Sequence, residues 1–232
     1  MVKQLTYGMV GGDLKALIGE CHRKALGLDP RAKLVCGCFS AIDELNDECA
    51  EAYHVDKSRV YYSAEDMAKA EAGKIDFVSI CTPNFVHYSA AKTFLEHGIN
   101  VVCEKPLTLT VEGAEDLERI AKEKNLVFAV DYCYSGYVMC KVMKQMIARG
   151  DIGKIISIEM SEHVGYDHMG VSYVRGKWRS EKLCYAPMLL AKSCHDVDLM
   201  MWLMRQKPVT IASFGGDFQF GLHNKPQKAG SR

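Results

Sequence analysis

Residues 5–19 have the sequence LTYGMVGGDLKALIG, and this stretch decides the fold. Residues 5–10 form an apolar run typical of a buried strand, the glycines after them indicate a tight turn, and a helix is expected from about Ile18. A strand that turns through glycines into a helix is the first unit of a doubly wound α/β domain. The rest of the chain then has to supply further alternating strands and helices.

Short apolar runs continue to alternate with amphipathic stretches as far as residue 130. Strands of this kind, separated by helices, require right-handed crossovers and a parallel sheet, and their Val/Ile-rich character fits a sheet covered on both faces. Residues 1–132 are therefore predicted to form a Rossmann-type dinucleotide-binding domain. Further strands are expected at 33–39, 60–62, 77–81, 99–103 and 126–130. Further helices are expected at about 42–53, after the capping box of Ser63 and Asp66, from the break at 82–84 to about 97, and from Thr110 to Lys124.

Residues 133–232 have a different rhythm. A helix at 136–149 ending at Gly150, a strand at 155–160, an apolar helix at 192–204 and a strand at 209–214 are expected there. Two strands and one buried helix do not make a self-contained sheet. This part of the chain therefore looks like the start of a second α/β domain that is truncated.

Bulk properties exclude several classes of protein. The 232 residues carry a formal net charge of zero, so no basic surplus favours nucleic acid or an anionic membrane. The N-terminus does not resemble a signal peptide, and no apolar run approaches the ~20 residues of a membrane span. We therefore expect a cytoplasmic protein with neither nucleic acid nor membrane as a partner.

The ten cysteines are scattered and include no C-x-x-C pair, so no metal site is expected. The tightest pair, Cys36 and Cys38, lies in a predicted strand, where both side chains point the same way with too little reach for a metal loop. The preferred interpretation is free thiols packed as small core residues in a reducing compartment.

Glycines in the first turn are candidate cofactor-binding residues. A pyrophosphate needs close approach of the backbone where a strand turns into a helix, whose N-terminus supplies N–H donors. Gly11, Gly12 and Gly19 suit this need. However, the six residues 13–18 depart from the G-x-G-x-x-G spacing, so an ordinary glycine turn is an equal alternative. Asp13 is also an unusual neighbour for a phosphate.

The end of the second predicted strand bears on ribose recognition. An acidic residue at this place binds the adenosine ribose of NAD, and an arginine accommodates the extra phosphate of NADP. This chain has Phe39 and Ser40 there, with no arginine just after them. Ser40 is therefore the candidate contact, and the choice between NAD and NADP stays open.

Further candidates follow two central strands. Residues 82–84 (Thr-Pro-Asn) end one strand, with His87 in the first turn of the next helix, and Lys105 ends the following strand. In open parallel sheets, ligands bind at the carboxyl edge, so several such features at one edge favour a binding site. Taken singly, each has a simpler explanation: a turn-setting proline, a helix-capping asparagine and a solvated lysine.

A cluster of polar groups opens the last predicted helix. Lys192, His195 and Asp196 lie at i, i+3 and i+4 and share one face. Ser193 and Asp196 could form a capping box. That explanation does not account for His195, which can take a proton near neutral pH.

Together these residues resemble the Gfo/Idh/MocA oxidoreductases, and the resemblance extends from about Tyr7 to Phe214. It is carried by the Glu-Lys-Pro run at 104–106, Thr-Pro-Asn-x-x-His at 82–87, Arg-Gly-Asp-Ile-Gly-Lys-Ile at 149–155 and His-Asp-x-Asp-Leu at 195–199. The resemblance implies a Rossmann domain followed by an α/β domain with an open, mostly antiparallel sheet. That sheet would bind substrate and often pairs subunits, so a homo-oligomer is expected if the second domain is complete.

The same resemblance implies a chemistry. It is hydride transfer between NAD or NADP and a secondary alcohol or ketone of a sugar, cyclitol or related polyol. Lys105 would lie near the nicotinamide and the reacting oxygen, and His195 would act as acid/base. The positions that match the family's cofactor-lining residues are Gly11, Gly12, Gly19, Thr82, Pro83, Asn84, His87 and Glu104.

Three departures from the family accompany the resemblance. Ala191 stands where many members carry an aspartate, and two interpretations stay open: Lys192 takes over the charge role, or the acid/base pair is reduced. The glycine turn is longer than usual, and members are typically longer than this chain. Two alternatives stay open: an NAD-using, glycosidase-like enzyme without net redox, and a catalytically inactive nucleotide-binding fragment. Substrate contacts are expected in the stretch 165–187, from Tyr166, His168, Tyr173, Arg175, Lys177, Trp178 and Arg179.

Overall fold

The computed structural model describes residues 3–161, 188–212 and 214, and for 188–192 it describes the helical backbone alone. Five parallel strands form one sheet in the order β2-β1-β3-β4-β5. They are β1 (Leu5–Gly11), β2 (Ala32–Cys38), β3 (Phe77–Cys81), β4 (Asn100–Cys103) and β5 (Phe128–Val130). The predicted Rossmann-type sheet is thereby confirmed, and its strand order reverses between β1 and β3, where such folds bind ligands.

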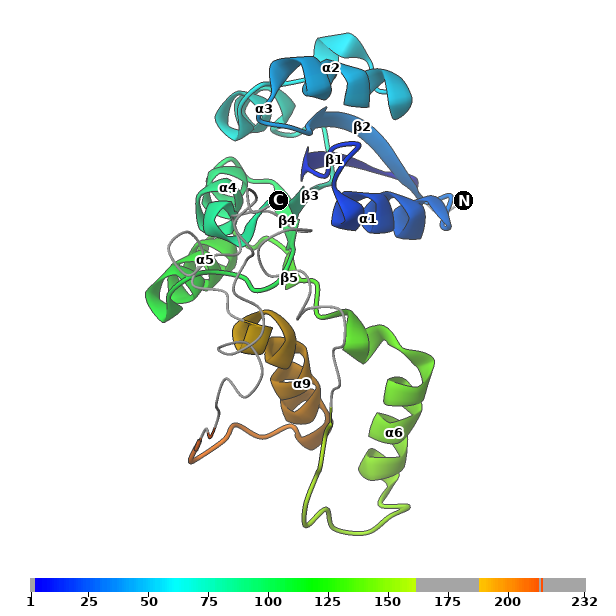
Figure 1. Ribbon diagram of the computed structural model, residues 1–232, viewed down its shortest axis with the longest axis vertical. Helices are drawn as coiled ribbons and strands as arrows, with labels where there is room; N and C mark the ends of the chain where they lie inside the picture. The colour runs from blue at the N-terminus through cyan, green and yellow to red at the C-terminus, as the bar shows by residue number, and fades with distance from the viewer. Residues whose placement is uncertain (1–2, 162–187, 213, 215–232) are drawn as a thin grey trace, which may run out of the picture.

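Helices cover both faces of this sheet (Figure 1). Helices α1 (Leu17–Gly27) and α2 (Asp43–Ala52) pack on one face, and α3 (Ala64–Glu71), α4 (Asn84–Glu96) and α5 (Val111–Glu123) pack on the other. The hydroxyls of Ser63 and Thr110 accept hydrogen bonds from backbone N–H groups in the first turns of α3 and α5. Both predicted helix starts are therefore confirmed, because each is fixed by a local cap.

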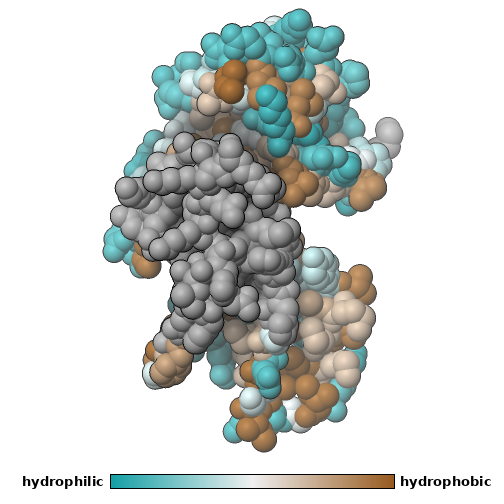
Figure 2. Space-filling view, in the orientation of Figure 1, coloured by the Kyte–Doolittle hydropathy of each residue, from teal (hydrophilic) through white to brown (hydrophobic). Residues whose placement is uncertain are grey.

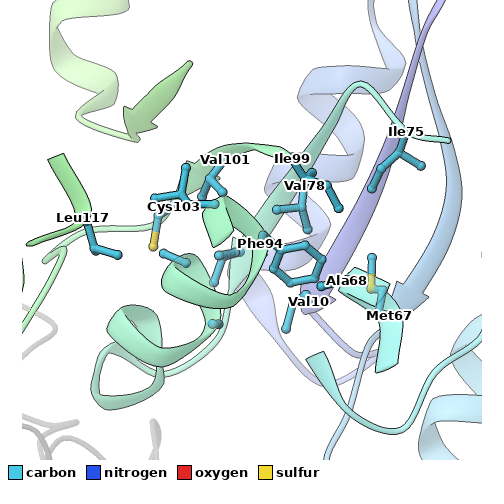
Figure 3. Close-up of a cluster of buried hydrophobic side chains, with 14 of the residues drawn as sticks. Val10, Met67, Ala68, Ile75, Val78, Phe94, Ile99, Val101, Cys103 and Leu117 are labelled. Carbon is cyan, nitrogen blue, oxygen red and sulfur yellow. The ribbon is translucent and has the colours of Figure 1, made fainter. Parts of the chain in front are cut away.

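The core lies in two layers because neighbouring side chains of a strand point to opposite faces. Met9 is buried toward α1 and α2, whereas the next residue, Val10, is buried toward α3, α4 and α5. Figure 3 shows the second layer, in which Phe94 of α4 lies among strand residues such as Val78 and Val101. This packing fixes the carboxyl edge of the sheet, where the candidate site lies.

The strand expected at 60–62 is wrong in its extent. The chain there makes one isolated parallel bridge between Gly37 and Val60, and the Tyr61 N–H donates to the Gly37 carbonyl. The short 3-10 helix η1 (Lys57–Arg59) precedes this bridge and the Ser63 cap follows it. Too few residues remain between these two helices for a paired strand.

In the second part of the chain, the described residues form a 3-10 helix, η2 (Cys133–Gly136), and two longer helices. Helix α6 (Val138–Arg149) ends at Gly150, whose φ of 78° allows the left-handed helix end that was predicted. Helix α9 (Met188–Met204) begins four residues before the predicted start at Lys192. Helices α6 and α9 meet at a small cluster of Cys140, Leu199 and Leu203.

The strands expected at 155–160 and 209–214 are not formed in the residues that the structure describes. Ile156 is 96% exposed and Val209 fully exposed, so among the described residues neither segment has a neighbouring strand to pair with or a layer to cover it. The open second sheet stays a prediction, and the expected substrate contacts between 165 and 187 lie outside the described residues. Among the described helices, none is long and apolar enough to cross a membrane.

Candidate active site

The three predicted glycines lie together at the carboxyl end of β1. Gly11 and Gly12 have φ values of 74° and 76°, which L side chains rarely adopt. A Cβ atom on Gly19 would lie 2.2 Å from the Gly12 Cα atom, and one on Gly11 would lie 2.9 Å from the Thr82 backbone nitrogen. These positions require glycine because backbone packs directly against backbone.

The Gly12 peptide is also fixed from behind by two side chains that the sequence did not reveal. Arg23 Nη1 donates to the Gly12 carbonyl over 2.6 Å, and Tyr53 Oη donates to it over 3.1 Å. The Arg23 guanidinium lies 3.7 Å from the centre of the Tyr53 ring. Since the N-cap of α1, Ala16, offers no side-chain acceptor, this helix start keeps N–H groups suited to an anion.

Both oxygens of the Asp13 side chain accept hydrogen bonds. Its Oδ2 accepts from Ser40 Oγ over 3.4 Å, and its Oδ1 accepts from the Lys15 backbone N–H over 2.9 Å. The structure thus places a carboxylate from the β1–α1 loop beside Ser40, just past the end of β2. This position accounts for an acid that looked out of place in a phosphate-binding turn.

Thr82 and His87 join the ends of β3 and β4. Thr82 Oγ1 is buried and has no hydrogen-bond partner among the residues that the structure describes. The ring nitrogens of His87 lie 2.9 Å from the Pro106 carbonyl oxygen and 2.8 Å from the Thr82 carbonyl oxygen. Burial lowers the pKa of His87. His87 therefore bridges the two turns that carry the candidate residues.

Asn84 does not cap α4, contrary to the simpler explanation of its sequence. It is the first residue of the helix, the N-cap position is Pro83, and the Asn84 side chain is buried. The Asn84 amide is therefore a buried polar group at the sheet edge, and buried polar groups are generally held in place by hydrogen bonds.

Glu104 is the centre of a buried polar cluster. Its Oε2 accepts from the Lys105 backbone N–H over 3.0 Å, and its Oε1 lies 3.0 Å from His22 Nε2. The other ring nitrogen of His22 lies 2.9 Å from Ser79 Oγ. The peptide that carries Lys105 is thereby anchored to α1 and β3.

Asp131 follows β5 and completes this cluster. Its Oδ2 lies 3.2 Å from the same His22 Nε2 atom, and its backbone N–H donates to the Cys103 carbonyl. Burial opposes a charged His22, but hydrogen bonds to Asp131, Cys81 and Glu104 outweigh it and raise the pKa of His22 to about 12. His22, Glu104 and Asp131 are residue types that can bind a metal ion. Here the protonated His22 ring lies between the two carboxylates, and a protonated ring nitrogen has no lone pair to offer a metal.

His195 lies in an aromatic pocket made by the segment after Asp131. Its ring stacks on Tyr134 with centroids 4.3 Å apart, and Tyr132 meets it edge-on at 5.9 Å. The His195 side chain is buried. Helix α9 and η2 are therefore joined at the histidine that the sequence singled out.

The end of β5 connects the segments that carry Lys105 and His195. The Asp131 N–H donates to the Cys103 carbonyl, two residues before Lys105, and the next residue, Tyr132, meets the His195 ring edge-on. The hydrogen bond from His22 lowers the pKa of Asp131, and the charges of His195 and Lys105 act in the same direction. Ala191 and Lys192 lie in α9, but their side chains are outside the described residues.

Besides Arg23 and Tyr53, sequence reasoning missed four residues around Lys105 and His195: His22, Asp131, Tyr132 and Tyr134. Asp131 had a usable signal, since it follows a predicted strand at the same edge as Lys105. His22 had none, because its partners Ser79 and Glu104 are 57 and 82 residues away in the chain.

The family descriptions that match this chain agree with the geometry. Residues 5–132 match "Oxidoreductase family, NAD-binding Rossmann fold", and residues 140–225 match "GFO/IDH/MocA C-terminal domain". The turn at Gly11, Gly12 and Gly19, here called the glycine cradle, brings the start of α1 to this edge, and Thr82 Oγ1 has no hydrogen-bond partner among the described residues. Both features suit a bound dinucleotide.

Individual relatives are similar over most of this chain. The uncharacterized oxidoreductase YfiI of Bacillus subtilis is 32% identical over 80% of this chain and 49% of its own length. An inositol dehydrogenase homolog from Azotobacter vinelandii, complexed with NAD+, is 31% identical with a TM-score of 0.82, covering 88% of this chain and 55% of that one. The structure described as that homolog with NADH and myo-inositol is 35% identical with a TM-score of 0.63, covering 67% and 42%.

The chain spans about half the length of the curated relatives it matches, 49% in the case of YfiI. What those proteins bind therefore describes them and not yet this chain. The family match itself covers more than half of the 232 residues, and the parallel sheet and glycine turn agree with it. This chain belongs to the Gfo/Idh/MocA oxidoreductase family, with an NAD-binding Rossmann fold.

Proposed function

We propose that the protein transfers hydride between a nicotinamide cofactor and a secondary alcohol or ketone of a sugar, cyclitol or related polyol. The observation that carries this proposal is the end of β5, at the sheet edge that also holds the glycine cradle. Asp131 is hydrogen-bonded there to the strand end that carries Lys105, and the tyrosines that follow it pack against His195. When bound, the cofactor supplies the hydride acceptor or donor. The residues of the chain then have to bind it, place the substrate oxygen and move one proton.

Cofactor binding is assigned to the edge formed by β1, β3 and β4. Gly11, Gly12 and Gly19 let the turn between β1 and α1 pack closely on neighbouring protein atoms, since a Cβ atom at any of them would meet those atoms. The N–H groups at the start of α1 are then the proposed donors to a pyrophosphate. Thr82 Oγ1, next to this cradle, is buried and has no hydrogen-bond partner among the described residues. The other proposed cofactor residues are Ser40, Pro83, Asn84, His87, Glu104 and Lys105.

Asp13 and Ser40 support NAD over NADP as the cofactor. Their hydroxyl–carboxylate pair lies just past the end of β2, where an adenosine ribose is recognised in this fold. A carboxylate accepts hydrogen bonds from ribose hydroxyls and repels a phosphate. In this proposal Asp13 supplies the acid that the end of β2 lacks.

Proton transfer is assigned to His195. Its stacking on Tyr134 fixes the ring plane, and a fixed imidazole is suited to taking a proton from a substrate hydroxyl near neutral pH. Lys105 places a positive charge where the substrate oxygen becomes negative, which lowers the barrier by electrostatic stabilisation. Lys192 stays a proposed third member of this group.

The substrate class follows from chemistry and similarity together. A cation and an acid/base group suit oxidation of a carbon that carries a hydroxyl. The relative from Azotobacter vinelandii that is described with NADH and myo-inositol supports a cyclitol among the candidates. We further propose that residues 1–132 bind the cofactor, that 133–232 contribute to the substrate side, and that the protein is a homo-oligomer.

The direct test is a panel of cyclitols, sugars and sugar acids incubated with NAD+, and of the matching ketones with NADH. Cofactor reduction or oxidation with at least one compound supports the proposal. NAD binding without turnover on the whole panel would favour an inactive nucleotide-binding protein. Release of a sugar leaving group without net NADH would favour the glycosidase-like alternative.

A histidine variant sharpens this test. His195→Asn should remove the near-neutral limb from the pH dependence of turnover, because the group that takes the proton is gone. The control is His54→Asn, at an exposed position with φ of 56°, a conformation that asparagine accepts readily. An unchanged profile in His195→Asn would contradict the assigned role.

A further inference from the structure

We infer that Asp131, fixed in place by His22, is a positioning residue that supplies the negative charge facing both Lys105 and His195. This inference rests on the proposed function, because it concerns the same two residues. It also answers a difficulty in the sequence, where Ala191 occupies the position at which many family members carry an acid. The structure assigns the acid to the end of β5 instead of to α9.

The backbone around Asp131 connects the two sides of the site. Its N–H donates to the Cys103 carbonyl, two residues before Lys105, so the end of β5 is hydrogen-bonded to the end of β4. The next residue, Tyr132, meets the His195 ring edge-on at 5.9 Å. Asp131 therefore lies between the turn that carries Lys105 and the helix that carries His195.

His22 holds the Asp131 carboxylate in one orientation. Its Nε2 lies 3.2 Å from Asp131 Oδ2 and 3.0 Å from Glu104 Oε1, and its Nδ1 lies 2.9 Å from Ser79 Oγ. The His22 side chain is 8% exposed, whereas that of Asp131 is 37% exposed. The acid is thus anchored on its inner side and accessible on its outer side.

The charges in the cluster make this arrangement consistent. The imidazolium of His22 lies between the carboxylates of Glu104 and Asp131. Without this positive charge the two carboxylates would be like charges close together in a largely buried place, and one of them would take up a proton. With His22 charged, Asp131 stays ionised and can stabilise positive charge on its outer side. Glu104 uses its second oxygen to hold the Lys105 peptide, so Asp131 is the acid left to act on the two side chains.

The titratable groups around His195 come from three elements. The end of β5 and η2 supply Asp131, Tyr132, Cys133 and Tyr134. The end of β4 supplies Glu104 and Lys105. Helix α9 itself supplies Cys194, Asp196 and Asp198. Only part of the negative charge therefore comes from Asp131. Removing it should shift the titration of His195 without abolishing it.

The test is an NMR titration of the His195 ring proton in the full chain, assigned by its loss in His195→Asn. In Asp131→Asn, the titration midpoint should fall by about 0.5 to 1 unit relative to the wild type, because the imidazolium loses a neighbouring anion. Asp131→Ser gives the same comparison where the asparagine variant fails to fold. An unchanged midpoint in a folded variant would overturn the inference.

The matched control is Asp76→Asn. Asp76 is also a part-exposed acid with a basic partner, Lys3. It directly precedes β3, so it lies at the amino ends of the parallel strands, whereas Asp131 lies at their carboxyl ends. Asp76→Asn should leave the His195 midpoint unchanged, and an equal shift in this control would also overturn the inference.

Kinetics give an independent readout. Asp131→Asn should lower kcat about tenfold while changing the Kd for NADH less than about twofold, and Asp131→Glu should recover part of the loss because the charge is restored. Equal losses in the asparagine and glutamate variants would mean a merely structural role. The NMR midpoint needs no turnover, so the inference and the proposed function can fail separately.

Discussion

The Rossmann part and the α6–α9 part of this chain hold their functional residues in different ways. In the first part, five paired strands with helices on both faces fix Gly11, Gly19 and Lys105 through the backbone. In the second part, the side chain of His195 packs against tyrosine rings, and the cluster between the two helices has three buried hydrophobic side chains among the residues that the structure describes. Figure 2 shows hydrophobic side chains on the outside of the lower part of the molecule, whereas the upper helices are mainly hydrophilic on view.

Because of this difference, substitutions in the two parts should change different measured properties. A substitution of a glycine in the turn between β1 and α1 should alter cofactor affinity and folding stability together, because the same backbone contacts serve both. A substitution beside His195 should alter turnover and leave cofactor affinity nearly unchanged. Four substitutions probe this comparison.

The largest effect is expected for Gly19→Ala. The new methyl group would meet the Gly12 Cα atom at 2.2 Å, so either α1 or the glycine turn has to move. Unfolding free energy should fall by about 1–3 kcal/mol, as in other overpacked sites, and NAD affinity should fall on the order of 100-fold, which is about 2.7 kcal/mol. Gly27→Ala in the same helix, where nothing lies within 4 Å, should keep both. Equal effects in the two variants would argue against the cradle.

The second effect concerns His22→Gln. Losing the imidazolium leaves Glu104 and Asp131 without their shared partner, which should cost about 2 kcal/mol, less than a fully buried pair because Asp131 is partly exposed. Urea unfolding followed by circular dichroism measures this loss. A variant as stable as the wild type would show that His22 is not charged in the folded protein.

The same residue makes a pH prediction with a definite sign. The pKa of His22 is raised from 6.5 to about 12, so the folded chain keeps a proton that the unfolded chain releases above pH 6.5. The stabilisation from His22 is therefore complete below pH 6.5 and declines as pH rises toward 12. Between pH 7 and pH 10, wild-type stability should fall more steeply than that of His22→Gln. Parallel curves would contradict the assignment.

A smaller effect is expected for Tyr134→Leu. Removing the ring that stacks on His195 at 4.3 Å frees the imidazole, so kcat should fall about tenfold with the Kd for NAD unchanged. Tyr137→Leu is the control, since this exposed ring stacks on Tyr134 but not on His195. A parallel loss of NAD affinity in Tyr134→Leu would mean that the two parts of the site are not separable.

The smallest effect is expected for Asp13→Asn. Losing one charge beside Ser40 should reduce the preference for NAD over NADP about tenfold, measured as a ratio of two dissociation constants. Ser40→Ala should have a weaker effect because it removes a hydroxyl and keeps the charge. An unchanged ratio in Asp13→Asn would place the adenosine ribose elsewhere.

The sequence predicted those features that depend on near neighbours. The β1 strand, the caps at Ser63 and Thr110 and the helix end at Gly150 are each written in a few consecutive residues, and all are confirmed. The strand at 60–62 was overestimated, because pairing depends on the room left by adjacent helices. Local patterns therefore gave the scaffold with an error at one sheet edge.

The site was only partly predictable, because its polar contacts join distant parts of the chain. Lys105 and the glycines could be found from strand ends, which always meet at one edge of a parallel sheet. His22 could not, because a histidine inside a helix carries no sign of the carboxylates it will meet. Nor could the Asp13–Ser40 contact be read from spacing, since it depends on how the long glycine turn folds back.

The central claim is tested most directly by Lys105→Met, measured in parallel for turnover and for NAD binding. Methionine keeps the length of the side chain and removes the charge that stabilises the substrate oxygen. The account predicts that kcat falls on the order of 100-fold or more, about 2.7 kcal/mol of transition-state stabilisation, while the Kd for NAD changes less than about threefold. Wild-type turnover in this variant would contradict the account.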